Sequence, residues 1–210
     1  MLSPDTAFAF FSLSLLLALA PGPDNLFLLM ISASQGRRAG FAVLTGLMLG
    51  VLVHTLAVAL GLAAVFAASA TAFTVLKLAG AAYLLYLAWG AWRAPASVQA
   101  ETAGAAPPQS WWRLVGRGVV MNLTNPKVLL FFLALLPQFV VPAQGGVVLQ
   151  IVSLGLLFIA AGALVFAAVI LAADALRARL ARSARAQRGL NRMAALVFTG
   201  LALRLVTAQR

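Results

Sequence analysis

The chain has few side chains that could cross-link it or bind a metal ion. Its 210 residues include no cysteine, one histidine and four acidic residues. Without cysteine, disulfides and thiolate metal sites are excluded, and one histidine is too few for an imidazole-rich centre. The apolar segments also contain no paired acids and no nucleophile beside a base. We therefore expect no metal, no cofactor and no enzymatic activity.

Charged residues of either sign are scarce as well. Only 9% of the residues are charged, whereas 63% are hydrophobic and the mean hydropathy is +1.03. A soluble domain has roughly 45–50% apolar and about 25% charged residues. This chain could not cover itself with polar surface in water. Its composition indicates an integral membrane protein.

Apolar runs of about 20 residues, the length that crosses a bilayer as a helix, predict an all-α protein with six transmembrane spans. They lie at Ala7–Ser32, Phe41–Ala67, Phe73–Trp92, Val115–Val141, Val147–Ala173 and Met193–Val206. The sixth has the least certain limits, because it is short and contains Arg204. The first run is preceded by Asp5 and by no basic residue, so we expect a retained span and not a cleaved signal peptide.

Basic residues gather in alternate gaps between these spans. Two arginines follow span one, three lie between Arg93 and Arg117, and six lie between Arg177 and Arg192. The gaps at 68–72 and 142–146 contain no lysine or arginine. The positive-inside rule then predicts cytoplasmic basic gaps and both termini on the periplasmic or extracellular side.

The net charge of +11 therefore reflects topology and does not indicate a nucleic-acid partner. The run from Arg177 to Arg192 is expected to rest on anionic lipid. The sequence is compatible with a homo-oligomer but contains no feature that decides it.

The spans predict one transmembrane domain over residues 1–210, made of two halves of three spans each. The halves are about 1–93 and about 114–210, joined by a cytoplasmic linker at about 94–113 that is rich in alanine and proline. Three spans per half make the halves run in opposite directions, as in inverted-repeat transporters. A six-helix bundle without internal symmetry stays an alternative.

Two spans contain prolines beside polar residues. Span one has Pro21, Gly22, Pro23, Asp24 and Asn25, and span four has Asn122, Thr124, Asn125, Pro126 and Lys127. Proline removes a backbone donor and displaces its predecessor from the helical region, so we expect both helices to break. Span one should restart near Pro23 or Asp24, and span four at Pro126 with Thr124 or Asn125 as the cap. The break in span one falls past the middle of that run, and the break in span four before its middle.

Each restart would expose backbone N–H groups and the positive end of a half-helix within the membrane. Discontinuous helices of this kind form substrate sites in transporters. A purely structural proline kink is the alternative at each break.

Asp24 and Lys127 carry opposite charges, one beside each break. An isolated charge at mid-bilayer costs several kcal/mol, so such residues tend to be functional. If the two spans pack together, the charges can neutralise each other or bind the two ends of an amino acid. Its ammonium then suits Asp24 and its carboxylate suits Lys127. Asp24 is also a candidate to exchange a proton when the substrate leaves.

Three further polar residues are weaker candidates. Lys77 lies near the outer end of span three and can extend to the headgroups. Tyr83 suits packing with a satisfied hydroxyl. His54 is either a proton carrier or a hydrogen-bonded helix contact. Gly46 and Gly50 have the spacing for close helix packing.

Three segments carry a family resemblance. "LALAPGPDNLFLL", "LKLAGAAYLLYLAWGAWR" and "GVVMNLTNPKVLLFFLALLPQFV" resemble the lysine-exporter and homoserine/threonine-exporter superfamily, LysE/RhtB, in order and spacing. The matching positions are Pro21, Gly22, Pro23, Asp24, Asn25, Lys77, Gly80, Tyr83, Gly90, Asn122, Asn125, Pro126 and Lys127.

The resemblance implies a secondary active transporter of the bacterial inner membrane. It would export amino acids or close derivatives by proton antiport. An ion or metal exporter of related architecture is the alternative, although the scarcity of cysteine, histidine and acidic residues opposes a metal path.

Overall fold

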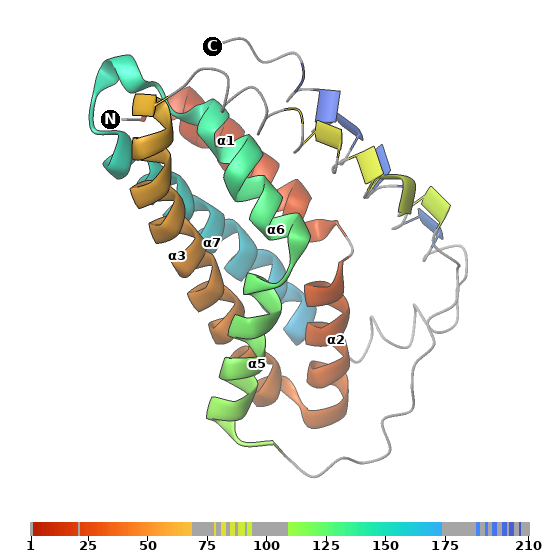
Figure 1. The fold of residues 1–210 in the computed structure, drawn as a ribbon. Coiled ribbons are helices and arrows are strands. Elements are labelled where there is room, and N and C mark those ends of the chain that lie inside the picture. The colour runs from red at the N-terminus through yellow and green to blue at the C-terminus, as the bar shows by residue number, and fades with distance from the viewer. Residues whose placement is uncertain are drawn as a thin grey trace.

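A computed structural model describes residues 2–20, 22–68 and 109–173, with short groups of residues between 78 and 93 and between 188 and 206. Every regular element in these ranges is a helix and none is a strand (Figure 1). The prediction of an all-α membrane protein is confirmed. Pro21, Lys77, Gly80 and Tyr83 lie outside the described residues, as do more than half of the third predicted span, half of the sixth, and most of the basic run from Arg177 to Arg192.

The helices follow the order of the predicted spans. They are α1 (Pro4–Leu19), α2 (Pro23–Gln35), α3 (Arg37–Ala68), α5 (Trp111–Leu123), α6 (Pro126–Leu130), the π-helix η1 (Phe131–Leu135), the 3₁₀ helices η2 (Leu136–Phe139) and η3 (Pro142–Gln144), and α7 (Val147–Leu171).

Four of these stretches account for four predicted spans. The 25-residue segments Arg37–Gly61 and Val147–Leu171 are each long and apolar enough to cross a membrane. Two bent pairs of helices meet the same criterion when each pair is taken as one span, α1 with α2 bent by 62° and α5 with Pro126–Phe139 bent by 51°. The expected breaks in the first and fourth spans are therefore present, while the count of six spans stays a prediction.

Both breaks lie near the middle of their spans. Helix α1 has 16 residues and α2 has 13, and α5 has 13 residues before the elements of 5, 5 and 4 residues that follow it. As expected, the break in span one lies past the middle and the break in span four before it, although the second lies closer to the middle than hydropathy indicated because α5 begins at Trp111 and not at Val115. Figure 1 shows α1 and α6 in the upper half of the view and α2 and α5 in the lower half.

Glycines bring α3 and α5 into direct backbone contact. A Cβ atom on Gly46 would collide with the carbonyl oxygen of Val115 and lie 2.9 Å from Cα of Gly118. A Cβ atom on Gly50 would lie 2.7 Å from Cβ of Asn122. The close packing expected at Gly46 and Gly50 is thus present, and α5 supplies the partner surface. This contact sets the depth at which Asn122 faces α3.

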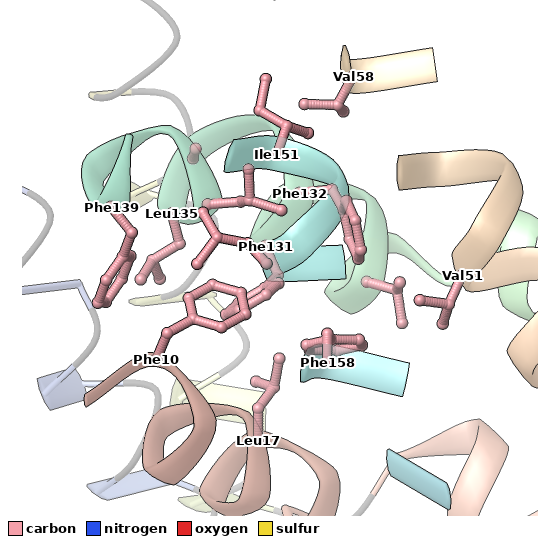
Figure 2. Close-up of a cluster of buried hydrophobic side chains, with 14 of the residues drawn as sticks. Phe10, Leu17, Val51, Val58, Phe131, Phe132, Leu135, Phe139, Ile151 and Phe158 are labelled. Atoms are coloured by element: carbon pink, nitrogen blue, oxygen red, sulfur yellow. The ribbon is translucent and has the colours of Figure 1, made fainter. Parts of the chain in front are cut away.

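An aromatic cluster joins α1, η1, η2 and α7 (Figure 2). Phe10 lies 5.7 Å from Phe131 and 5.0 Å from Phe139 between ring centroids. Phe158 of α7 lies 4.8 Å from Phe131 and 5.4 Å from Phe132. Aromatic pairs in such geometry contribute about 0.5–1.5 kcal/mol each beyond the area they bury. The cluster therefore fixes the first half of span one to the second half of span four.

Gln150 holds the loop that precedes α7. Its side-chain amide donates to the carbonyl oxygens of Val141 and Gly145 at 3.1 and 2.7 Å, and its Oε1 accepts from the N–H of Val141 at 2.9 Å. The side chain is buried, and these three bonds satisfy it.

The outward surface of the helices is apolar. Large side chains such as Leu60, Leu149, Leu156 and Leu164 are more than half exposed. Exposed leucines on this scale suit hydrocarbon and not water. The polar residues of the candidate site, by contrast, are buried between the helices.

Candidate functional site at the two helix breaks

The first break follows from the two prolines of "PGPDN". Helix α1 ends at Leu19, and Ala20 is extended with its N–H donating to Leu16 at 3.0 Å. Gly22 is extended at φ −161°, and Pro23 opens α2 as its first residue. The side chain of Asn25 does not cap α2 but points back, and its Nδ2 donates to the carbonyl oxygen of Ala18 at 2.7 Å. The break therefore frees carbonyl groups at the end of α1, and one of them is bound by Asn25.

The second break is built by Asn125 and Pro126. Helix α5 ends at Leu123, and the hydroxyl of Thr124 donates back to Val120 at 2.8 Å. Asn125 is extended, and its Oδ1 accepts from the backbone N–H of Lys127 at 3.0 Å. Between the two caps considered, Asn125 takes the role and Thr124 does not.

The two breaks meet through Lys127. Its Nζ donates to the carbonyl oxygens of Ala20 at 3.2 Å and Leu17 at 3.4 Å, both at the end of α1. The lysine side chain is only 5% exposed. A cation at the carboxyl end of a helix is favourable, because the helix dipole and the free carbonyls there are negative. The ammonium therefore neutralises the end that the first break creates.

Asp24 completes a buried polar cluster in the first turn of α2. Its side chain is 2% exposed. Its carboxylate interacts electrostatically with the side-chain amides of Asn122 and Asn125 and with the Lys127 ammonium. The two helix breaks thus bring together a carboxylate, an ammonium group and two amides at one place.

Four buried side-chain atoms of this cluster have no hydrogen-bond partner among the described residues. They are Oδ1 of Asp24, Asn25 and Asn122, and Nδ2 of Asn125. A buried polar atom without a partner costs about 1–3 kcal/mol. Three acceptors and one donor in one small region are the pattern expected of a site that binds a polar ligand.

His54 lies beside this cluster without entering it. Its Nε2 is 3.4 Å from the carbonyl oxygen of Asn122, and its ring stacks on Phe132 with centroids 5.7 Å apart. Both contacts join α3 to the broken span. Of the two interpretations offered by the sequence, the geometry matches the helix contact.

Gly22 leaves room for the end of the Lys127 side chain, a role that its sequence position alone does not indicate. A Cβ atom at Gly22 would lie 3.1 Å from Nζ of Lys127 and 3.5 Å from its Cε. Gly118, opposite Gly46, and Gln150 were likewise not predicted. A glycine in "VGRG" and a lone glutamine in span five are the only sequence signals for them.

In the ranges that the structure describes, no three histidine, cysteine or acidic side chains come together as metal ligands would. The polar cluster therefore consists of side-chain amides, one carboxylate and one ammonium group. Such groups suit an organic ligand with its own charges.

Comparison with known proteins gives consistent matches. The family model of the LysE type translocators matches residues 15–209. A homoserine/homoserine lactone efflux protein of Salmonella typhimurium is 41% identical over 137 residues, which cover 65% of this chain and 66% of that protein. A leucine efflux protein of an Enterobacter species is 32% identical over 125 residues, 59% of this chain and 58% of that protein. No solved structure matches.

One relative aligns almost end to end. An uncharacterized membrane protein of Vibrio cholerae is 33% identical over 202 residues, which cover 96% of both chains. The two efflux proteins are matched over less than two thirds of their length. The family model covers nearly the whole sequence and both helix breaks. The chain therefore belongs to the LysE type translocator family.

Proposed function

We propose that this chain exports amino acids or close derivatives across the inner membrane of a bacterium as a secondary active transporter. The observation that carries the proposal is the buried polar cluster at the meeting point of the two helix breaks. The names of the two efflux relatives, for homoserine or homoserine lactone and for leucine, support the substrate class.

The cluster offers groups that match both ends of an amino acid. A primary ammonium has three N–H donors, and Oδ1 of Asp24 and Oδ1 of Asn25 are acceptors without a partner among the described residues. A carboxylate needs donors, and Nδ2 of Asn125 is a donor that has no partner there either. The N–H groups in the first turn of α2 add a positive helix end for the same carboxylate.

Proton antiport follows from the charge of Asp24. A proton and a substrate ammonium each neutralise this carboxylate, and each excludes the other. If Asp24 is protonated from the outside and binds the substrate from the cytoplasm, export of one couples to entry of the other. Mutual exclusion at a single carboxylate is the minimum requirement for such exchange.

The orientation expected from the arginines fits an exporter. With the basic gaps in the cytoplasm and both termini outside, residues 109–117 form the cytoplasmic end of span four. The run from Arg177 to Arg192 then rests on anionic lipid of the inner leaflet.

Transport by purified protein tests the proposal. Proteoliposomes are loaded with single radiolabelled amino acids, and efflux is followed under an imposed pH gradient. We expect Asp24→Asn to abolish pH-driven efflux while the protein stays inserted and folded. The matched control is Asp5→Asn, which removes the same charge from an exposed residue outside the cluster.

The result that overturns the proposal is plain. Either no amino acid leaves the wild-type liposomes, or Asp24→Asn exports as the wild type does. A parallel series loaded with zinc, manganese or cobalt ions tests the ion or metal exporter, which predicts movement of the metal ion alone.

A further inference from the structure

We propose that the Lys127 ammonium occupies the place of the substrate's ammonium whenever the transporter is empty, so that Lys127 serves as an internal replacement cation. This inference rests on the proposed function. We call this place the cation seat and define it by the carbonyl oxygens of Leu17 and Ala20 and by Oδ1 of Asn25, with the Asp24 carboxylate acting on it electrostatically.

The cation seat is suited to an ammonium whether or not the ammonium is tethered. The carbonyls of Leu17 and Ala20 lie at the carboxyl end of α1, where the break leaves them without helical partners. A Cβ atom on Gly22 would lie 3.1 Å from Nζ of Lys127 and 3.9 Å from Oδ1 of Asn25, so both atoms flank one small space. Asp24 supplies the negative charge.

Lys127 is held loosely in the seat. Its two hydrogen bonds measure 3.2 and 3.4 Å, whereas charge-assisted bonds of this type are about 2.7–2.9 Å long. Both bonds go to main-chain oxygens. The side-chain oxygens Oδ1 of Asp24 and Oδ1 of Asn25 stay without a partner among the described residues. A substrate ammonium that displaces the Lys127 ammonium would therefore have unused acceptors beside it.

Charge balance allows the exchange for a zwitterion. The buried cluster contains one negative and one positive side chain, Asp24 and Lys127. An amino acid adds both charges at once, so the total stays balanced in a region where an excess charge is costly. Its ammonium takes the cation seat, and the displaced Lys127 then pairs with its carboxylate.

The replacement cation has a consequence for the transport cycle. Lys127 is used in both forms of the transporter, because it occupies the seat when the site is empty and pairs with the substrate's carboxylate when the site is loaded. Without the lysine, the cluster carries one uncompensated negative charge in either form, since a zwitterion adds no net charge. Removal of the ammonium should therefore lower net efflux and the exchange of one substrate molecule for another together.

Lys127→Met tests this requirement, because methionine keeps an unbranched side chain of similar length and removes the charge. Net efflux and counterflow of L-leucine and L-homoserine are measured in the same proteoliposome preparation. We expect both to fall by more than about tenfold in a variant that keeps the wild-type melting temperature. If either stays within about twofold of the wild type, the proposal is wrong.

A binding measurement tests the seat without transport. In Lys127→Ala the seat is vacant, and methylammonium is a free primary ammonium of the right size. We expect methylammonium to raise the melting temperature of Lys127→Ala and to leave that of the wild type unchanged. Tetramethylammonium has no N–H donor and should have no effect on either.

The two measurements separate the possible failures. An equal response of wild type and Lys127→Ala to methylammonium, or none in either, overturns the cation seat. If wild-type protein moves no amino acid while Lys127→Ala still binds methylammonium, the proposed function fails and the seat stands.

Discussion

The ammonium nitrogen of Lys127 lies 3.2 Å from the carbonyl oxygen of Ala20, although 107 positions separate the two residues in the sequence. One residue opens the second half of a broken span, and the other ends the first half of another. The contact therefore couples the two breaks directly. Anything that moves α1 relative to α6 must change it.

Gly22→Ala should impair transport without unfolding the protein. Gly22 has φ −161°, which alanine adopts readily, so the effect is steric. The added Cβ would lie 3.1 Å from Nζ of Lys127, the flexible end of a side chain that can retreat. We expect the free energy of unfolding to change by less than about 0.5 kcal/mol and net efflux to fall severalfold. Gly116→Ala, where no atom lies within 4 Å of an added Cβ, is the control and should transport normally.

Asn125 should show two separable roles, because its two side-chain atoms do different things. Oδ1 caps α6 at 3.0 Å from the N–H of Lys127, and Nδ2 has no partner in the described structure. Asn125→Ala should lose about 1 kcal/mol of stability together with transport. Asn125→Ser retains a capping oxygen, so we expect it to recover the melting temperature but not the efflux rate. Recovery of both would show that the amide donor has no part in transport.

Gly46→Ala should destabilise the protein directly. Its Cβ would meet the carbonyl oxygen of Val115 and Cα of Gly118, and backbone atoms cannot retreat as a side-chain end can. We expect a loss of about 1–3 kcal/mol, measured as a lower melting temperature in detergent. Gly61→Ala lies on the same helix in open space and should be neutral. Equal melting temperatures for the two variants would contradict the close contact of α3 and α5.

Single cysteines should reveal which side of the membrane each loop faces, because the chain has no cysteine of its own. Ala143→Cys and Ser110→Cys both replace exposed residues, before α7 and before α5. The arginine distribution predicts an external Ala143 and a cytoplasmic Ser110. A membrane-impermeant maleimide should label the first in intact cells and the second only after permeabilisation. The reverse pattern would invert the orientation and the direction of transport that we propose.

The sequence predicted the helix breaks well because proline acts locally. Pro23 and Pro126 each begin a helix, since a missing N–H costs nothing at a first helical position. Hydropathy predicted the outer limits less well. Helix α5 starts at Trp111 and includes Arg113 and Arg117, which interrupt the apolar run without interrupting the helix. A search for apolar runs does not detect a helix start that contains arginines on one face.

The partners of Lys127 could not be predicted in the same way. Two opposite charges beside two breaks suggested a direct pair or a shared ligand. The structure gives the ammonium two main-chain carbonyls, and every residue has such a carbonyl. Only the course of the chain after Leu19 decides which carbonyls are free. The same holds for Gly118, whose meaning depends on its position opposite Gly46.

The aromatic cluster gives α1 a second attachment to span four. Phe10 lies about 15 Å along the helix from Ala20, at a rise of 1.5 Å per residue, and contacts Phe131 and Phe139. One end of α1 is thus held by ring packing, which no charge or proton alters, and the other end by two long hydrogen bonds to an ammonium. If Lys127 were released, α1 would keep its aromatic contacts near Phe10 and lose its polar contacts near Ala20. The helix could then tilt about its aromatic end.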